Sequence, residues 1–587
     1  AKRRLMRLFI LIFILLINLN SQNLKESTET VFNAFTEVKT NNRHLTPYLL
    51  EIAKNGQNLD YDDKNKLKGI GFNFNRKLIS RSGTKRSESA GLDKFVDSGH
   101  FRFHYTTSGY HAIDSKDQDN NALPDYLESV IEIFDNVSKI LHDQMGYTKP
   151  PGDGYYSTTR DKGGSGHYDI YIRSIPSKYY GYVQPEEYAQ SKGDNEKSES
   201  RIEKNAFTSY MAIRNNYKNF ILDEIENIKV TAAHEYYHAV QFGYDGWEKP
   251  WLLEASATWM EEEIFDEIND CYQYMKDWFQ YPHRSLDESG FHWYGSFIFF
   301  EYIEQHMGGT KAIRKIIEES VKSNSREKDG SHLAIDEALK IEGYSFQQAL
   351  NGMSIANQIM SSTGTQNYSY EEAQSYPVEG PAILETINFQ IGNQDTVESS
   401  RLARFASQYV QIISQTPVLV NLYNKSGSFS DLRLNAILKM NDNSYKVISS
   451  PSMNIDPKNL QSIYLSIVSQ DTTSGNWDYF LTVENGESGT NITVPEEFIL
   501  NNPYPNPFNG AVMFSIYKLN NSPVNIDIIN LNGRRIIRLH SGGLAAGNHT
   551  FAWNGIDDSR NKVASGVYYI KASGKLTEEW RPITYLK

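Results

Sequence analysis

The chain has 587 residues, too many for one hydrophobic core, so we expect roughly three or four domains. A formal net charge of −13 argues against nucleic acid as a partner and suits an extracellular protein. The hydrophobic content of 39% is ample for folding, while a lone cysteine, Cys271, excludes a disulfide within the chain.

The first residues have the pattern of a secretory signal peptide. Four basic residues among the first seven precede an unbroken apolar run at 8–17, and polar residues follow it. The run is too short to span a bilayer. We therefore expect a signal peptide at 1–21, cleavage after Ser21 and no transmembrane anchor thereafter, which predicts a secreted or outer-membrane cell-surface protein.

Residues 22–92 are polar and mixed, with a basic cluster between 76 and 86. They fit either a propeptide or an N-terminal helical extension, and the basic cluster is expected to be solvated surface. Three alternating runs at 100–105, 169–173 and 208–213 then predict strands.

An acidic loop after the first of these strands has the ligand spacing of an EF-hand calcium loop. Its oxygen donors are Asp117, Asp119, Asn121, Leu123 (through the backbone carbonyl), Asp125 and Glu128. Ala122 replaces the usual glycine of the loop, and a positive φ is costly for alanine. We predict structural Ca²⁺, with an acidic loop that caps the following helix as the alternative.

The run from His234 to His238 reads His-Glu-Tyr-Tyr-His. Residues four apart share a helical face, so both imidazoles can bind one metal ion, and Glu235 between them can accept a proton from water. Residues 225–233 contain no Gly or Pro and place apolar side chains at helical spacing, which predicts a helix that ends near Gly243. A pair of hydrogen-bonded core histidines is the alternative.

A zinc site needs a third protein ligand and an open position. Glu254 follows His238 by sixteen residues, in a Trp-Leu-Leu-Glu-Ala-Ser-Ala run that resembles the second metal-binding helix of the gluzincins. The resemblance implies that Glu254 is the third zinc ligand. The three glutamates at 261–263 are expected to form the solvated end of this helix, and Gln241 either orients a ligand or belongs to a polar rim.

Peptide hydrolysis builds negative charge on the carbonyl oxygen, so a hydrogen-bond donor must face it. Residues 291–302 predict an apolar helix whose beginning carries two candidates for this role, Tyr294 first and His292 second. Tyr294 fits equally well as an ordinary aromatic residue at a helix start. The helical half is expected to extend to about residue 375.

Helical periodicity stops after residue 385. Short β runs separated by Ser, Asn, Gly and Asp predict an antiparallel sandwich at 385–485, followed by a linker at 486–498. Residues 499–587 contain Asn-Pro-Tyr-Pro-Asn-Pro-Phe-Asn, an Asn-Gly-Arg turn and a Gly-Val-Tyr-Tyr block. They resemble the C-terminal sorting domain of the type IX secretion system and the Ig-like domain of flagellar hook-capping proteins. The resemblance implies that the type IX secretion machinery is a partner. An ordinary small β-sandwich is the alternative.

Residues 93–375 are also similar to a family of bacterial secreted metalloproteases that share a His-Phe-x-x-His-Tyr strand, a Pro-Asp-Tyr loop, the HExxH helix and a Trp-x-x-Glu-Ala segment. The expected fold is multidomain: an α+β zincin-like metallopeptidase domain followed by two all-β, Ig-like sandwich domains. The expected function is a secreted zinc metalloendopeptidase with a protein or peptide substrate. The alternatives are a catalytically silent adhesin or glycan-binding protein on the same scaffold, and a zinc-dependent cell-wall amidase.

Overall fold

The computed structural model of the chain describes residues 23–36, 44–75, 77–81, 86–152, 163–175, 178–189, 203, 205–321, 331–362, 367–424, 432–470, 476–488, 498–501, 503–518, 521–531, 533–545, 547–574 and 578–587. The predicted signal peptide and most of the predicted linker lie outside these residues. The chain divides into two compact units. The first comprises Ala1–Trp278, Asp287–Ala349 and Ser375–Val378, and the second comprises Phe279–Leu286, Leu350–Gln374 and Glu379–Lys587.

A five-stranded sheet forms the centre of the first unit, in the order β1-β2-β3-β5-β4. Its strands are β1 (Lys94–Ser98), β2 (Phe101–Tyr105), β3 (Tyr168–Arg173), β4 (Gly181–Tyr188) and β5 (Phe207–Arg214). β2, β3 and β5 are parallel, whereas β1 and β4 are antiparallel edge strands. The three predicted strands are confirmed. β4 was not predicted because Pro185 interrupts its pattern, and proline is tolerated in a sheet mainly at an edge.

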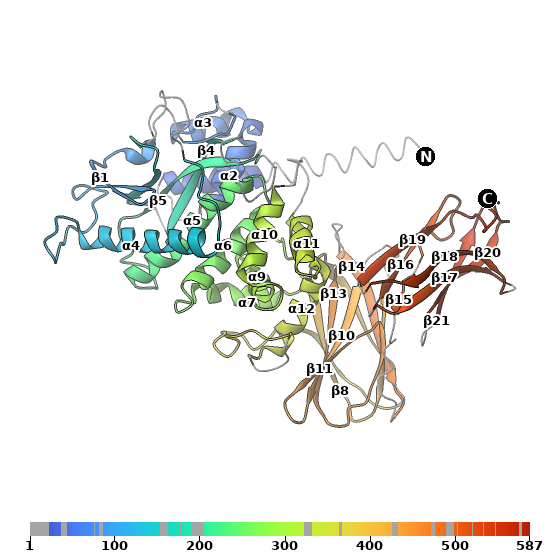
Figure 1. Cartoon of the computed structure of the whole chain (residues 1–587). Helices are drawn as coiled ribbons and strands as arrows, with labels where there is room; N and C mark the ends of the chain where they lie inside the picture. The colour runs from blue at the N-terminus through green and yellow to red at the C-terminus, as the bar shows by residue number, and fades with distance from the viewer. Residues whose placement is uncertain are drawn as a thin grey trace. The chain divides into compact units, whose positions relative to one another are not determined.

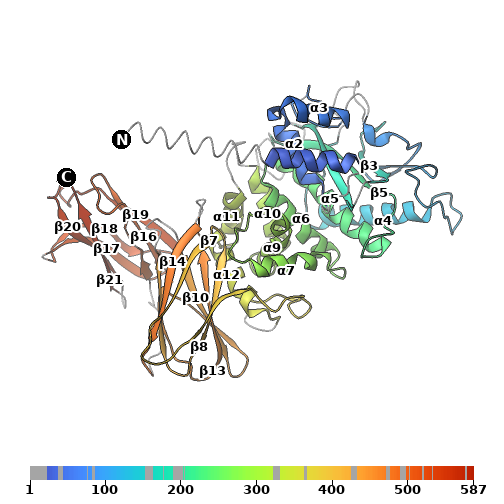
Figure 2. The ribbon, with the colours of Figure 1, turned by 180° about the vertical axis from the view of Figure 1, so that it is seen from behind.

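Helices cover both faces of this sheet, because alternate side chains of each strand point to opposite sides (Figure 1). On one face, the N-terminal helices contribute Leu49 and Ile52 to a core shared with Tyr171 and Tyr210. On the other face, Phe101 packs edge-on against the long helices. Figure 2 shows the N-terminal helices in front of the strands when the sheet is seen from behind. The helices are a first one at 23–35, α2 (Thr46–Asn55), α3 (Tyr61–Gly69), α4 (Asp125–Lys139) and α5 (Glu224–Asp245).

The remaining helices of this part of the chain follow α5. They are α6 (Pro250–Ile264), α7 (Met275–Gln280), α8 (Phe291–Gly295), α9 (Phe297–His306), α10 (Gly309–Ser320), α11 (Ser331–Ile341) and α12 (Phe346–Ile359). The single helix predicted at 291–302 is therefore two, which meet at Ser296. The Ser296 hydroxyl donates to the backbone carbonyl of His292, a local bond that competes with helix continuation. In the described residues, no helix is long and apolar enough to cross a bilayer.

The second unit contains two β-sandwiches, each with its own hydrophobic core. The first pairs the sheets β11-β10-β13-β8-β6 and β12-β9-β14-β7, and the second pairs β15-β16-β19 and β18-β17-β20-β21. Their bounds are β6 (Ile383–Asn388), β7 (Asp395–Ala403), β8 (Ser407–Ile413), β9 (Val418–Asn424), β10 (Leu432–Met440), β11 (Tyr445–Ser449), β12 (Ser452–Ile455), β13 (Leu460–Ser469), β14 (Asn476–Asn485), β15 (Phe498–Leu500), β16 (Val512–Lys518), β17 (Pro523–Asn530), β18 (Arg535–Gly543), β19 (Gly547–Trp553), β20 (Gly566–Ser573) and β21 (Glu578–Tyr585). The β periodicity of the sequence after residue 385 is confirmed.

One member of the basic cluster, Arg86, is buried rather than solvated as predicted, with 1% of its surface exposed. Its guanidinium donates to Asp169 at 2.5 Å and to both oxygens of Glu186 at 3.0 and 2.5 Å. The sequence places these partners 83 and 100 residues away, so no local pattern reveals them. This arginine joins the N-terminal segment to β3 and β4.

Replacing Arg86 with methionine should lower the free energy of unfolding by about 3–5 kcal/mol, because two buried carboxylates lose their counter-ion. Urea unfolding followed by tryptophan fluorescence measures the change. Lys340→Met is the matched control, since Lys340 is 56% exposed and its ion pairs contribute less than about 1 kcal/mol. Equal, small losses for both variants would contradict this role of Arg86.

Candidate metal centre

The structure brings the three predicted zinc ligands together. His234 and His238 lie one turn apart on α5, and their Nε2 atoms are 3.0 Å apart. Glu254 is on α6. Its Oε2 lies 3.4 Å from Nε2 of His234, and its Oε1 lies 3.3 Å from Nε2 of His238. All three side chains are 1–3% exposed. Two imidazoles and a carboxylate thus point at one small volume.

The spacing of these ligand atoms fits zinc. Zn–N and Zn–O bonds of about 2.0–2.2 Å in a tetrahedron separate the ligand atoms by roughly 3.3 Å. The three observed separations, 3.0, 3.3 and 3.4 Å, lie around that value. Uncompensated buried polar atoms are costly, so a shared cation is a physical reason for this arrangement.

The other ring nitrogen of each histidine has its own acceptor. Nδ1–H of His234 donates to Glu261 at 2.6 Å, and Nδ1–H of His238 donates to Oε1 of Gln241 at 2.8 Å. The Gln241 amide in turn donates to Ser256 Oγ at 2.9 Å. These bonds select the tautomer that leaves both Nε2 lone pairs available for a metal. Gln241 is therefore buried and fixes the ring of His238, a predicted ligand, so it is not a polar rim.

The prediction that the glutamates at the end of α6 are solvated is wrong for two of the three. Glu261 is 5% exposed and holds His234, and Glu262 is 7% exposed and accepts a bond from Cys271 at 3.0 Å. Glu261 follows Glu254 by seven residues, two helical turns, so both face α5. That spacing in the sequence could have predicted the burial of Glu261, but the run of three acidic residues obscured it.

The buried ionisable groups of this site shift one another's pKa values. Burial opposes ionisation of Glu254, but the facing histidines outweigh it and hold the pKa of Glu254 well below its usual range. Burial likewise opposes a charged His234, yet the hydrogen bonds that it donates to the carboxylates of Glu254 and Glu261 hold its pKa well above the usual value. Burial raises the pKa of Glu261 to about 7.

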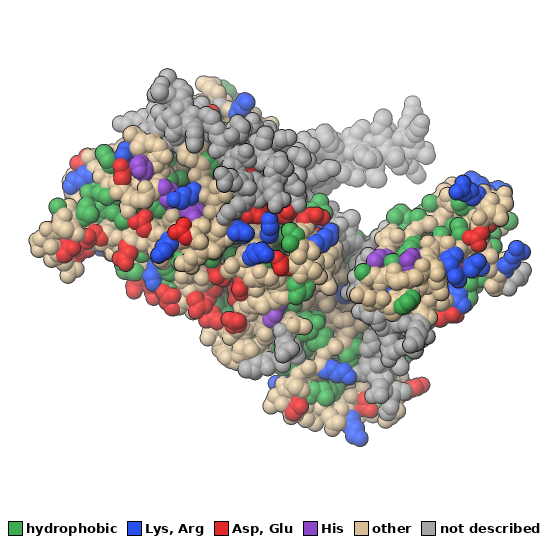
Figure 3. Space-filling model, viewed as in Figure 1, with side chains coloured by type: hydrophobic (Ala, Val, Ile, Leu, Met, Phe, Trp, Pro, Cys, Tyr) green, Lys and Arg blue, Asp and Glu red, His purple; other side chains and the backbone are tan. Residues whose placement is uncertain are grey.

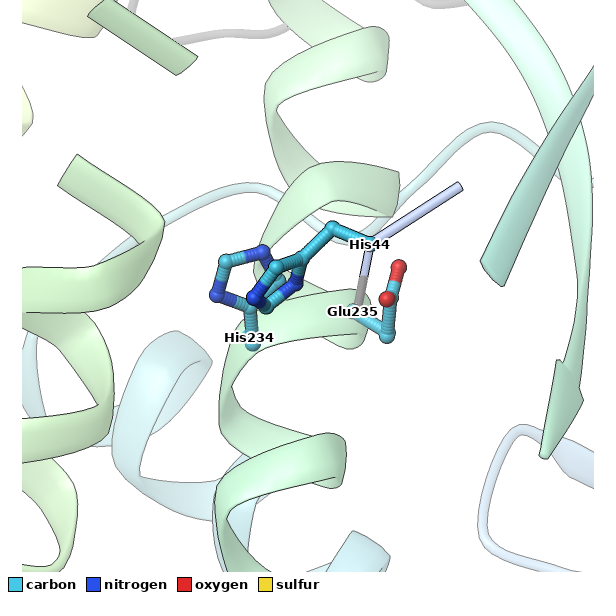
Figure 4. Close-up of side chains that lie close together, drawn as sticks. All are labelled: His44, His234 and Glu235. Carbon is cyan, nitrogen blue, oxygen red and sulfur yellow. The ribbon is translucent and has the colours of Figure 1, made fainter. Parts of the chain in front are cut away.

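Glu235, the predicted proton acceptor, is 1% exposed, and burial raises its pKa. Its Oε2 accepts a bond from Thr46 Oγ1 at 2.7 Å. His44 also reaches this site: His44, His234 and Glu235 each offer a ligand atom within 4.8 Å of the other two (Figure 4). Sequence reasoning missed His44 and Thr46, because no motif marks the segment that carries them.

The two candidates for the oxyanion donor lie in different surroundings. Tyr294 stacks on His44 at 4.5 Å, and burial together with the charge of Glu254 raises its pKa well above the usual value. His292 packs on Trp278 at 4.4 Å, and its Nδ1 is 3.9 Å from Asp277. Tyr294 is therefore the candidate that lies beside the predicted zinc ligands.

The acidic loop predicted to bind calcium lies before α4, where Figure 3 shows acidic side chains on the surface. Its polar groups bond to one another: Asp117 accepts from the backbone of Ala122 at 2.9 Å, and Asn121 donates to Glu128 at 2.5 Å. Asp125 accepts from Gln118, and the Leu123 backbone donates to Asn121. In the described residues, the loop contributes no group of three His, Cys or acidic ligands within 4.8 Å of one another, and Asp119 stays exposed. Calcium binding remains a prediction.

Comparisons with known proteins bear mainly on the second unit. The model of the FlgD Ig-like domain matches residues 508–578, which confirms an Ig-like fold within the predicted C-terminal domain. No curated protein matches the chain significantly.

Several solved structures are similar to parts of the chain. PorZ, a surface component of the type IX secretion system of Porphyromonas gingivalis, is 19% identical over 18% of this chain and 14% of its own, with a TM-score of 0.12. A β-1,2-glucanase from Parabacteroides distasonis is 9% identical over 31% of this chain and 30% of its own, with a TM-score of 0.12. A DUF4785 family protein from Legionella pneumophila is 12% identical over 33% of this chain and 64% of its own, again with a TM-score of 0.12. The chain spans less than two thirds of each of these structures, and at these TM-scores the matches carry no argument about function.

Glu261→Gln should weaken zinc binding about 10–100-fold, because the amide is a weaker acceptor for the His234 ring. Competition with a chromophoric chelator measures the affinity. Glu267→Gln, which alters a 64% exposed glutamate just beyond α6, is the matched control and should leave the affinity unchanged. Equal affinities for both variants would contradict the orienting role of Glu261.

Removing the metal should destabilise the first unit, since a ligand that binds only the folded state contributes about 2.7 kcal/mol at 100 times its dissociation constant. Differential scanning calorimetry before and after chelation should therefore show a lower Tm. Zn²⁺ should restore the transition and Mg²⁺ should not, because imidazole ligands favour zinc. An unchanged Tm would contradict a bound structural or catalytic ion here.

Proposed function

We propose that the chain is a secreted zinc metalloendopeptidase. The observation that carries the proposal is the convergence of His234, His238 and Glu254 on one point, with Glu235 buried beside them on the same helix. Zinc-dependent hydrolases use three protein ligands of these types and a nearby carboxylate.

Bound zinc would lower the pKa of a coordinated water to about 7 and polarise a carbonyl. Glu235 accepts a proton from the attacking water and passes it to the leaving amine. Burial raises the pKa of Glu235 above its usual value, which favours its taking up a proton from water. The hydroxyl of Tyr294 donates to the oxyanion.

The edge strand β4 supports a peptide as the substrate. Gly181 of β4 lies against α5, where a side chain at this position would meet Glu235 at 3.4 Å. Among the described strands β4 pairs with β5 alone, and the backbone N–H of Val183 donates to Thr46 Oγ1 at 2.9 Å rather than to β5. An extended peptide can add to such an edge through main-chain hydrogen bonds. Peptide bonds in the interior of the substrate can then reach the metal. This favours an endopeptidase.

The Ig-like C-terminal domain supports export through the type IX secretion machinery, by the resemblance of residues 499–587 to its sorting domains. The protein would then act outside the cell or at its surface. The acidic loop at 117–128 would add a structural calcium ion on this exterior, where Ca²⁺ is available to weak extracellular sites.

Glu235→Gln should lower kcat about 10²–10⁴-fold while keeping zinc bound, because the amide cannot accept the proton. Mass spectrometry of a mixed peptide library measures cleavage, and elemental analysis measures bound zinc. Glu267→Gln is the control and should cleave as the natural chain does.

Three other outcomes would contradict the proposal. Loss of zinc from Glu235→Gln would assign Glu235 to metal binding instead. Release of peptidoglycan fragments without peptide cleavage would indicate a cell-wall amidase. Bound zinc without any turnover would indicate a catalytically silent scaffold, such as an adhesin.

A further inference from the structure

A short run of the N-terminal segment, just before and at the start of α2, enters the candidate metal centre. Thr46 is 1% exposed, and its hydroxyl donates to Glu235 at 2.7 Å while it accepts the backbone N–H of Val183 at 2.9 Å. Glu235 is the proton acceptor of the proposed reaction, and the Val183 N–H is a main-chain donor of the edge strand. Thr46 therefore occupies two partners that an incoming peptide and its attacking water need.

His44 lies on the metal side of Thr46. Its ring centroid is 4.5 Å from that of His234 and 4.5 Å from that of Tyr294. Its Nε2 is 3.0 Å from the Tyr274 hydroxyl, and its Nδ1 is buried. The ring thus stands between a zinc ligand and the oxyanion donor, where the scissile carbonyl of a substrate has to bind. Figure 4 shows it directly over His234 and beside Glu235.

The rest of the segment anchors this run. Leu45, Leu49 and Ile52 are buried, and all three belong to the core that the segment shares with the sheet. Pro47 lies in the first turn of α2, where its restricted φ suits the helix. A group tethered to a folded anchor has an effective concentration of the order of millimolar, so free substrate must compete with it.

We propose that the N-terminal segment, residues 44–75, is a built-in inhibitor of the site, with His44 as the fourth metal ligand and Thr46 in the place of substrate. The proposal rests on the proposed zinc peptidase and assigns its regulation. His44 offers a ligand atom within 4.8 Å of ligand atoms of His234, one of the three predicted zinc ligands, and of Glu235, and an imidazole is a common zinc ligand.

The test uses the full chain loaded with Co²⁺, whose visible spectrum reports its ligands, and azide as a small probe of an open position. In the natural chain, azide should leave the spectrum unchanged, because His44 closes the site. In His44→Ala, azide should bind and shift the spectrum. The zinc form of this variant should cleave an internally quenched peptide with a kcat/KM at least about tenfold higher, since the tethered competitor is weakened.

His44→Phe keeps an aromatic ring on Tyr294 and His234 but removes both nitrogens. It should admit azide to the metal and raise kcat/KM for the peptide less than His44→Ala does, because the ring still blocks the substrate. It also tests ligation if the alanine variant fails to fold. His549→Ala, in the C-terminal Ig-like domain, is the matched control and should behave as the natural chain does.

The outcomes separate this inference from the proposed function. If His44→Ala binds azide but cleaves no peptide, the result would support His44 as a metal ligand and contradict the proposed peptidase function. Azide binding by the natural chain as readily as by His44→Ala would overturn the inhibitor, whatever the peptidase result. Peptide cleavage by the natural chain at the rate of His44→Ala would do the same.

Discussion

The structure of the first unit depends on keeping four ionisable side chains inside a dry core. His234, His238, Glu254 and Glu235 are each at most 2% exposed. Unpaired buried charges cost several kcal/mol each, so such a group persists only when its members satisfy one another or share a cation. Every neighbouring element serves that requirement. α5 supplies the histidines, α6 supplies Glu254, and hydrogen bonds donated by the rings to Glu261 and Gln241 hold them in place.

The surrounding fold determines how this centre meets solvent and substrate. The sheet supports α5 along one face, and its antiparallel edge strand β4 passes beside Glu235. The N-terminal helices cover the opposite face of the sheet. Without them, Tyr171 and Tyr210 on that face would be exposed. The segment that forms these helices also brings His44 and Thr46 to the candidate metal centre. Covering the sheet and closing the site are thus two consequences of one packing arrangement.

Local features of the site were predictable from sequence, and long-range ones were not. A four-residue spacing on a helix is enough to pair His234 with His238, and short alternating runs were enough for most strands. Arg86 finds Asp169 and Glu186 only after the chain folds, and Thr46 finds Glu235 across 189 residues. Charge alone suggested surface positions for Arg86, and burial overrode that expectation.

The most direct measurement of the central claim is anomalous diffraction at the zinc edge from crystals of the full chain grown with zinc. The account predicts one strong peak bonded to Nε2 of His234, Nε2 of His238 and the carboxylate of Glu254, with His44 as the fourth ligand. A peak at these three ligands with His44 turned away would keep the metal site and contradict the inhibitor. No peak at this position would contradict the metal site and the function built on it.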